Sequence, residues 1–168
     1  SKAWYDAPAA QSLACARTVH QQLRMQNESL TAVPGLRVGH AHDLRARTGC
    51  TVILGPFRAA AFVAGFATGT RELHVLDSNH LAPQADAILL TGGSAFGLAA
   101  ADGVVAWLEE HGQGFDAGVA RVPLVPAAVL FDLGVGDAHT RPDARMGRAA
   151  CVAASTESVT EGAVGAGA

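Results

Sequence analysis

The stretch that decides the fold is AILLTGGSAFGL, residues 87–98. It opens with a short, continuous apolar run, which is typical of a strand that is buried on both faces. The paired glycines permit a tight turn, and Ser94 is of a residue type that caps helix N-termini. From Phe96 to Leu108 apolar residues recur at helical spacing, and Gly112 is a typical helix end. The stretch therefore predicts a strand, a turn and a helix, the repeating unit of an α/β fold.

Weaker patterns of the same kind extend on both sides of this stretch. Apolar runs with β-branched residues or period-two alternation predict strands, and an alanine-rich run predicts a second helix. The predicted strands cover residues 36–40, 51–54, 60–66 and 125–133, and the second helix covers residues 144–154. Residues 1–30 are predicted to form an extension with one short amphipathic helix, and the main domain begins at residue 31. The last segment, 162–168, has the composition of the opening of a Gly-rich loop.

The composition excludes several classes of protein. The 168 residues are 49% hydrophobic and 16% charged with a formal net charge of −3, the opposite of a chain disordered by charge. Lys and Arg number 12 against 15 Asp and Glu, without a basic run, so we expect no nucleic-acid partner. No apolar run reaches the roughly 18 residues of a membrane span, so we expect no membrane partner. Three cysteines without C-x-x-C spacing indicate neither a disulfide framework nor a zinc site, and we expect a reducing, cytoplasmic setting.

The turn formed by Gly92, Gly93 and Ser94 is the strongest local candidate for chemistry. Glycines before a helix start leave backbone N–H groups and positive potential that can hold an anion or an oxyanion. Three interpretations compete: a nucleophile elbow G-x-S-x-G, a phosphate loop, and a structural turn capped by Ser94. Phe96 occupies the last glycine position of the elbow, and Leu98 replaces the lysine of the phosphate loop. For the glycines alone, the structural interpretation is favoured.

A second candidate is the pair His40 and His42, followed by Asp43. Alternate residues of a strand share a face, so the two imidazoles can ligate one metal ion. A zinc or iron site needs further ligands, and the histidines nearest in sequence, His74 and His80, have a spacing that fits no helix pair. Surface or turn histidines are commoner, so we predict no metal and no cofactor.

The remaining polar residues have ordinary interpretations beside the functional ones. Asp132 and Asp137 follow a predicted strand, where carboxylates can be catalytic, although Asp beside glycine is also usual turn chemistry. Arg141-Pro142-Asp143 is predicted to be a turn with a local ion pair. Cys50 and Cys151 have no recognisable activating partner in the sequence and are predicted to be core thiols.

Whole segments, in order and spacing, carry a resemblance. They are AVPGLRVGH (32–40), TGCTVIL (48–54), GTRE (69–72), LTGGSAFGL (90–98), ADGV (101–104), VPAAVLFDL (125–133), RP (141–142) and GRAA (147–150). The chain resembles the self-processing peptidase family that includes L-aminopeptidase/D-esterase, β-aminopeptidases and the endo-type nylon-oligomer hydrolase. The resemblance covers roughly residues 31–168, and several ordered motifs make it specific.

The resemblance implies a fold and a reaction. The implied fold is an αββα four-layer sandwich of the N-terminal-nucleophile hydrolase type, with only part of it in this chain. Residues 31–168 would be its N-terminal (α-chain) portion, incomplete at the C-terminus. The precursor would cut itself before a Ser or Thr beyond this chain, and that residue becomes the nucleophile. The implied enzyme hydrolyses amide bonds as an aminopeptidase or an endo-amidase.

The same resemblance implies the partners. The substrate would be a small peptide, an amino-acid amide or an oligoamide, and the second partner the nucleophile-bearing C-terminal portion of the same precursor. We also expect a homo-oligomer. The resemblance places the nucleophile, the Asn oxyanion donor and the Lys of the family beyond this chain, so the catalytic residues stay unassigned. The site residues predicted here are the substrate-pocket or oxyanion wall of Gly92, Gly93, Ser94, Val129 and Phe131.

Two departures from the family bear on activity. A Tyr often stands at the position of Phe131, and Phe cannot donate its hydrogen bond. Aminopeptidase members carry a Glu at the position of Val129, where it holds the ammonium group of the substrate. The apolar residue here favours an endo-acting hydrolase over a strict aminopeptidase. The alternatives are an inactive binding or structural member of the fold and, less favoured, an esterase that uses Ser94.

Overall fold

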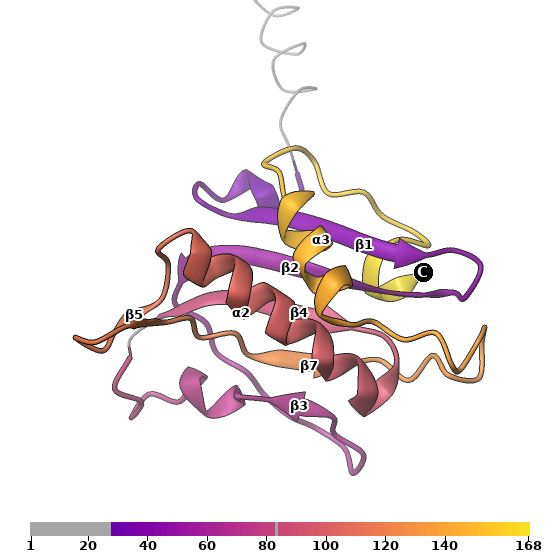
Figure 1. Ribbon diagram of the computed structural model, residues 1–168, viewed down its shortest axis with the longest axis horizontal. Coiled ribbons are helices and arrows are strands. Elements are labelled where there is room, and N and C mark those ends of the chain that lie inside the picture. Colours follow the sequence, from indigo (N-terminus) through magenta and orange to yellow (C-terminus); the bar gives the residue numbers. More distant parts are fainter. Residues whose placement is uncertain (1–27, 83) are drawn as a thin grey trace, which may run out of the picture.

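The computed structural model describes residues 28–82 and 84–168. In this part of the chain a five-stranded mixed sheet packs against two α-helices, and Figure 1 shows how they are arranged. The sheet has the strand order β1-β2-β4-β7-β3. The strands are β1 (Arg37–Asp43), β2 (Thr48–Phe57), β3 (Thr70–Arg71), β4 (Ala85–Thr91) and β7 (Ala127–Val129). The helices are α2 (Ala100–Glu110) and α3 (Ala144–Val152), with short 3₁₀ segments η1 (Leu30–Ala32), η2 (Leu73–Leu76), η3 (Ser94–Ala99) and η4 (Gly165–Gly167). A separate hairpin pairs β5 (Phe115–Asp116) with β6 (Arg121–Val122). The helix predicted within residues 1–30 falls almost entirely outside the described residues.

The strand pairing explains how distant segments meet. β1 and β2 form an antiparallel hairpin, and β2 pairs antiparallel with β4. β4 and β7 run parallel, with Thr91 opposite Val129. Parallel neighbours end at the same edge of a sheet. The segments that follow Thr91 and Val129 therefore leave the sheet side by side.

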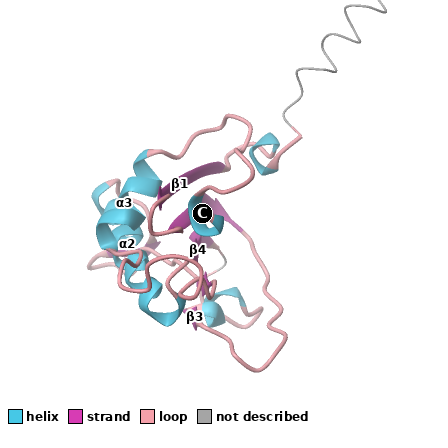
Figure 2. Ribbon diagram, turned by 90° about the vertical axis from the view of Figure 1, so that its right-hand side faces the viewer, coloured by secondary structure: helices cyan, strands magenta, loops and turns pink. Residues whose placement is uncertain are grey.

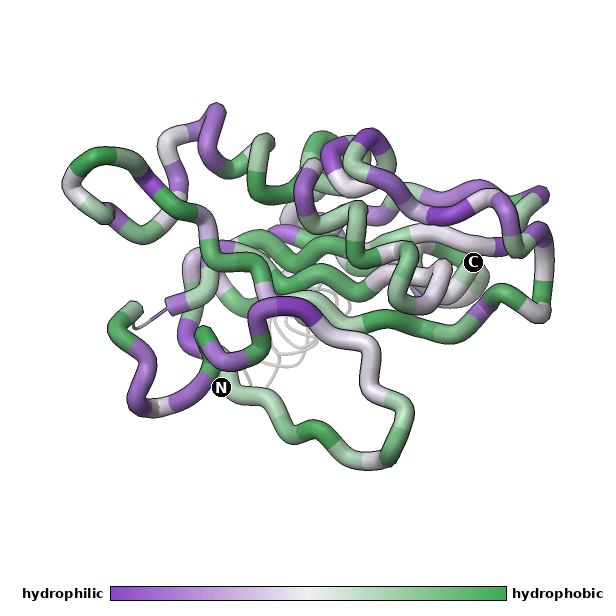
Figure 3. The backbone as a smooth tube through the Cα atoms, turned by 60° about the horizontal axis from the view of Figure 1, so that its bottom comes forward, coloured by the Kyte–Doolittle hydropathy of each residue, from purple (hydrophilic) through white to green (hydrophobic). Residues whose placement is uncertain are grey.

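Both helices cover one face of the sheet, as Figure 2 shows. α3 packs on β1 and β2, and α2 packs on α3 and β4. Because β residues alternate between faces, every second residue of β2 and β4 points at the helices. The side chains that meet there are fully buried: Cys50, Val52, Leu54, Ala87 and Leu89. The hydrophobic strands stand out in the hydropathy colouring of Figure 3.

Small residues set the distance between the two helices. A Cβ atom on Gly103 of α2 would collide with the carbonyl of Ala144, and one on Gly147 of α3 with the carbonyl of Ala100. The two backbones therefore approach at the closeness that only glycine permits. The abundance of small residues in these helices thus has a packing cause.

The opposite face of the sheet is largely uncovered. Ile53 and Ile88 are only half-buried, and Leu90 is 37% exposed. An apolar cavity of about 340 Å³ lies on this face, lined by Leu36 and Phe57 among others. Among the described residues, η1 and the loop after it border this cavity, and η4 lies over β1 and β2. The prediction of a strand buried on both faces is therefore wrong for β4 among the described residues, because Ile88 and Leu90 on its second face stay partly exposed.

Four of the predicted elements are confirmed within a few residues, one is absent, and one is shorter than predicted. Residues 60–66 form no strand: they are exposed, with Phe62 93% exposed, because no described strand pairs with them. The strand predicted at 125–133 is only three residues long, and Pro126, which directly precedes it, has no N–H to donate to the ladder. The strands at 36–40, 51–54 and 87–90 and the helix at 144–154 are confirmed.

The helix after the glycine turn begins differently from the prediction. Residues Ser94–Ala99 form a 3₁₀ segment, and the α-helix starts only at Ala100. Ser94 has a positive φ of 52° and makes no capping hydrogen bond, so the predicted N-cap is wrong. Gly112 ends the helix as predicted, with a φ of 67°. Within the described residues, no helix has the length and hydropathy needed to cross a membrane.

Candidate functional site

The turn after β4 and the segment after β7 form one hydrogen-bonded unit. The N–H of Leu130 donates to the carbonyl of Thr91 over 2.8 Å, and the N–H of Ser94 donates to the carbonyl of Leu130 over 3.0 Å. These bonds continue the parallel pairing beyond the ends of both strands. The structure therefore brings the turn at Gly92, Gly93 and Ser94 together with Val129 and Phe131, as parallel strands require.

Asp132 joins this unit to the start of β2. Its Oδ1 accepts the N–H of Gly93 over 2.7 Å, and its Oδ2 accepts the hydroxyl of Thr48 over 2.6 Å. A Cβ atom on Gly92 would collide with the Asp132 carboxylate and with Thr48 Oγ1. The N–H of Gly92 donates to the carbonyl of Gly49 over 2.8 Å. The glycine is thus required because a carboxylate occupies the space beside it.

The backbone donors of the turn are already in use. The three N–H groups of Gly92, Gly93 and Ser94 donate to Gly49, Asp132 and Leu130 respectively. The expectation that the turn offers these donors to a substrate is therefore wrong for this structure. The turn does hold an anion, as its glycines and helix start suggested, but the anion is the protein's own carboxylate.

The side chains around the turn are apolar and open to solvent. Phe131 is 77% exposed and Phe96 is 57% exposed. Val129 is half-buried, and its N–H donates to the carbonyl of Gly69 over 3.0 Å. Exposed aromatic side chains beside a rigid backbone turn are suited to contact a ligand. That the five predicted residues line a substrate pocket stays a prediction.

Arg141 adds a cation next to these aromatics. Its guanidinium carbon lies 3.6 Å from the centroid of the Phe96 ring, and its Nε donates to the carbonyl of Ala138 over 2.8 Å. The predicted ion pair between Arg141 and Asp143 is wrong, because Asp143 pairs with another arginine. Asp143 pairs with Arg145 at 3.1 Å and caps α3 by accepting the N–H of Met146.

The candidate metal ligands are engaged elsewhere. His40 Nδ1 lies 2.9 Å from Thr51 Oγ1, and His42 Nδ1 accepts the N–H of Gly165 over 3.3 Å. Asp43 accepts two backbone N–H groups in its own turn. Among the described residues, no three His, Cys, Asp or Glu side chains cluster as a metal site. Burial, followed by the neighbouring His42, lowers the pKa of His40, so this ring favours its neutral form.

The two described cysteines are core thiols, as predicted. Cys50 and Cys151 are free, buried, and part of the same hydrophobic core between the sheet and α3. Burial raises the pKa of each thiol to about 12. A thiol that stays protonated is a poor nucleophile. Neither cysteine is therefore a candidate for catalysis.

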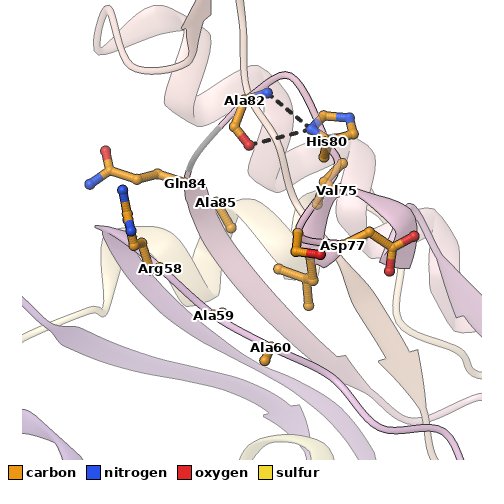
Figure 4. A pocket seen from close by; sticks show the side chains of 11 residues that line it. Arg58, Ala59, Ala60, Val75, Asp77, His80, Ala82, Gln84 and Ala85 are labelled. Atoms are coloured by element: carbon orange, nitrogen blue, oxygen red, sulfur yellow. Dashed lines mark hydrogen bonds between the residues drawn. The ribbon is translucent and has the colours of Figure 1, made fainter.

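A cavity of about 410 Å³ lies elsewhere, near the amino end of β4, and Figure 4 shows its lining. Arg58 and Gln84 project from one side of it, and Asp77 and His80 from the other. His80 Nδ1 accepts the N–H of Ala82 over 3.2 Å. None of the five residues predicted for the site lines this cavity. We therefore take the turn at the carboxyl end of β4 as the candidate site, and not this cavity of about 410 Å³.

Two features of this site lie beyond the reach of sequence reasoning. Thr48 is 84 residues from its partner Asp132, and no spacing rule connects them. The stacking of Arg141 on Phe96 depends on how the loop before α3 folds back. One signal was available: Asp132 follows directly after a predicted strand that runs beside the glycine turn.

Comparisons with known proteins point to one family. The model of peptidase family S58 matches residues 28–168. An uncharacterized aminopeptidase of Mycobacterium leprae is 45% identical in an alignment of 156 residues, and the match covers 83% of this chain and 43% of that protein. The 6-aminohexanoate-oligomer endohydrolase of Kocuria sp. is 37% identical over 136 residues, which are 80% of this chain and 36% of that protein. The chain thus spans about two fifths of the length of these relatives.

Solved structures show the same fold. A β-aminopeptidase of Burkholderia sp. superposes with a TM-score of 0.61 at 28% identity, over 83% of this chain and 42% of that one. The L-aminopeptidase D-Ala-esterase/amidase of Ochrobactrum anthropi superposes with a TM-score of 0.61 at 16% identity, over 83% of this chain and 43% of that one. That structure is described as a variant of the Ntn hydrolase fold, so the predicted fold class is confirmed for the part present here. The chain belongs to peptidase family S58.

Proposed function

We propose that the protein is an amide-bond hydrolase that matures by self-cleavage. The observation that carries the proposal is the match of residues 28–168 to peptidase family S58, together with the glycine turn and the Val129–Phe131 segment lying side by side. The nucleophile would be a Ser or Thr in the part of the relatives that this chain does not span. Such a residue, freed at a new N-terminus, can use its own α-amine as the base.

The uncovered sheet face supports the proposed partner of this chain. Half-buried Ile53 and Ile88 and exposed Leu90 lie on the face opposite the helices. Burying such apolar side chains stabilises by about 25 cal/mol per Å². We expect the nucleophile-bearing portion of the precursor to pack here and supply the second sheet of the sandwich.

The residue at position 129 supports a substrate preference. Val129 has no charge with which to pair a substrate ammonium group, and its half-buried side chain lies against Gly69. The substrate is therefore proposed to be an internal amide of a small peptide or oligoamide, cut in an endo manner. One relative is named for such an activity, and another as an aminopeptidase.

Two measurements on the full-length protein test the proposal. Intact mass spectrometry is expected to show two fragments, the second beginning with Ser or Thr, whereas a single uncut chain contradicts self-cleavage. Rates on a free and an N-acetylated amide are expected to be similar. Val129→Glu is expected to favour the free amine, and a strong preference for the free amine in the unchanged protein contradicts the endo assignment.

Phe131 motivates the second candidate, an inactive member of the family that binds without cutting. Its ring has no hydroxyl to donate to a reacting carbonyl. If the missing hydroxyl limits activity, Phe131→Tyr raises the rate of amide hydrolysis well above that of the unchanged protein. No hydrolysis by either form would favour the binding role.

An esterase that uses Ser94 is less well supported. Ser94 lies in the turn after β4, and its own φ is positive at 52°. A nucleophile elbow has a strained backbone of this kind. Its hydroxyl makes no hydrogen bond to a base among the residues that the structure describes. Ser94→Ala is expected to leave hydrolysis unchanged. A reducing, cytoplasmic setting and a homo-oligomer remain further proposals that rest on the sequence.

A further inference from the structure

Asp132 connects three segments that are distant in the sequence at the candidate site. It accepts from Thr48 at the start of β2 and from Gly93 in the turn after β4, and it lies three residues beyond the end of β7. Thr48 and Gly93 are both buried. Hydrogen bonds to an ionised carboxylate are among the stronger ones in proteins. The Asp132 carboxylate therefore holds the start of β2, the turn after β4 and the segment after β7 together.

Phe131 is held between two such anchored residues. On one side, both backbone polar groups of Leu130 are bonded to the turn, and on the other the Asp132 carboxylate is bonded to Gly93. The Phe131 side chain itself is free to meet a ligand, because it is 77% exposed. Its backbone position is thus determined by its neighbours rather than by burial of its own ring.

We propose that Asp132 is a positioning residue for the hydrolysis named above, which holds Phe131 and the glycine turn in the geometry that the bound substrate needs. This inference rests on the proposed function. Each oxygen of the carboxylate accepts one hydrogen bond from within the protein, from Gly93 or from Thr48. Asp132 acts through the backbone of the turn and of Phe131. Small displacements of such groups lower a rate strongly, since reacting atoms must be held within a fraction of an ångström.

Variants of the full-length protein test the role. Asp132→Ala is expected to lower kcat for amide hydrolysis about tenfold or more, with KM changed far less. Asp132→Asn is expected to restore kcat to within about threefold, because its amide oxygen accepts from Gly93 and its amide nitrogen donates to Thr48. Rescue by Asn separates positioning from any need for the negative charge.

Asp86 is the matched control. It is half-buried at the opposite end of β4, and its carboxylate accepts one backbone N–H, that of Leu124, over 2.8 Å. Asp86→Ala is expected to lower the thermal midpoint as Asp132→Ala does, while kcat stays unchanged. Equal losses of kcat in the two variants would mean a general structural effect and overturn the proposal.

A second pair covers the case in which Asp132→Ala does not fold. Thr48→Val removes one of the two bonds without changing the side-chain shape, and Thr48→Ser keeps it. We expect Thr48→Val to lower kcat and Thr48→Ser, which keeps the hydroxyl, to retain clearly more kcat than Thr48→Val does; equal values overturn the inference. If the full-length protein without any substitution does not hydrolyse amides, the proposed function is refuted, and the positioning role of Asp132 with it.

Discussion

The two faces of the sheet differ although they are built from the same strands. Leu89 points at the helices and is fully buried, whereas its neighbour Leu90 points away and is 37% exposed. The same alternation holds in β2, where Val52 is buried and Ile53 is half-buried. The strands carry apolar residues on both faces, as strands covered on both sides do. Among the described residues, one face of the sheet is therefore packed under the helices, and the other carries partly exposed apolar side chains.

The largest expected effect contrasts the two neighbouring leucines. In the 168-residue chain, Leu89→Ala is expected to cost about 3 kcal/mol of unfolding free energy, since it opens a cavity in a filled core. Leu90→Ala is expected to cost less than about 1 kcal/mol, because its side chain is partly in water already. Denaturant unfolding followed by circular dichroism measures both.

The same pair in the full-length protein sharpens the comparison. If the open face is covered there, the cost of Leu90→Ala rises towards that of Leu89→Ala. A small cost for Leu90→Ala in the full-length protein would contradict a second layer on this face.

The next effect concerns the contact between α2 and α3, the two helices that cover one face of the sheet. Gly103→Val places side-chain atoms against the carbonyl of Ala144 and is expected to destabilise by about 1–3 kcal/mol. Ala106→Val, on the exposed side of the same helix, is the control and is expected to cost about 0.5 kcal/mol through helix propensity alone. Thermal unfolding compares them. Equal midpoints would show that the helices do not approach through Gly103.

A smaller effect concerns the N-terminus of α3, the helix over β1 and β2. Asp143→Ala removes the cap on the Met146 N–H and is expected to cost about 1 kcal/mol, while Asp143→Ser keeps most of it. The backbone N–H of Met146 lowers the pKa of Asp143 below its usual value. The stabilisation is therefore full above the unfolded pKa, near 4, and is lost as the pH falls through the folded pKa. The gap between Asp143→Ala and the unchanged chain should close in acid; a constant gap would contradict the cap.

The smallest effect lies on the open face, where η4 covers β1. The pKa of His40 is lowered, so the unfolded chain takes up its proton at a higher pH than the folded chain does. Stability is thus expected to be full above about pH 6.5 and to fall as the pH drops below that value. His40→Gln should reduce this slope between pH 7 and pH 5 in urea titrations. An unchanged slope would assign it to other groups.

Much of the fold could be predicted from local pattern, because hydrophobic period and turn chemistry are written in adjacent residues. β4, the glycine turn and α3 were found in this way. Residues 60–66 were predicted as a strand because they are apolar, yet a strand needs a hydrogen-bonded neighbour, and the described chain supplies none. Ser94 was predicted as a cap from its residue type, whereas it has a positive φ and its N–H donates to the carbonyl of Leu130 in a distant segment.

The site divides in the same manner. The candidate residues Gly92 and Phe131 came from motif order, and the parallel pairing of β4 with β7 brings them together. The bond from Thr48 to Asp132 could not be predicted, because it joins residues that only the closed sheet makes neighbours. Nor could the use of the three turn N–H groups, since their acceptors come from other segments.

The sequence by itself determined the α/β class, the order of the elements, the thiols that lie in the core and the family to which the segments belong. These properties depend on residue type and short-range spacing. Only the tertiary structure decided which face of the sheet is covered, which anion fills the glycine turn and which carboxylate holds Phe131 in place. Those properties depend on contacts between segments up to 84 residues apart, whose free energy is realised only when the strands pair and the helices pack on them.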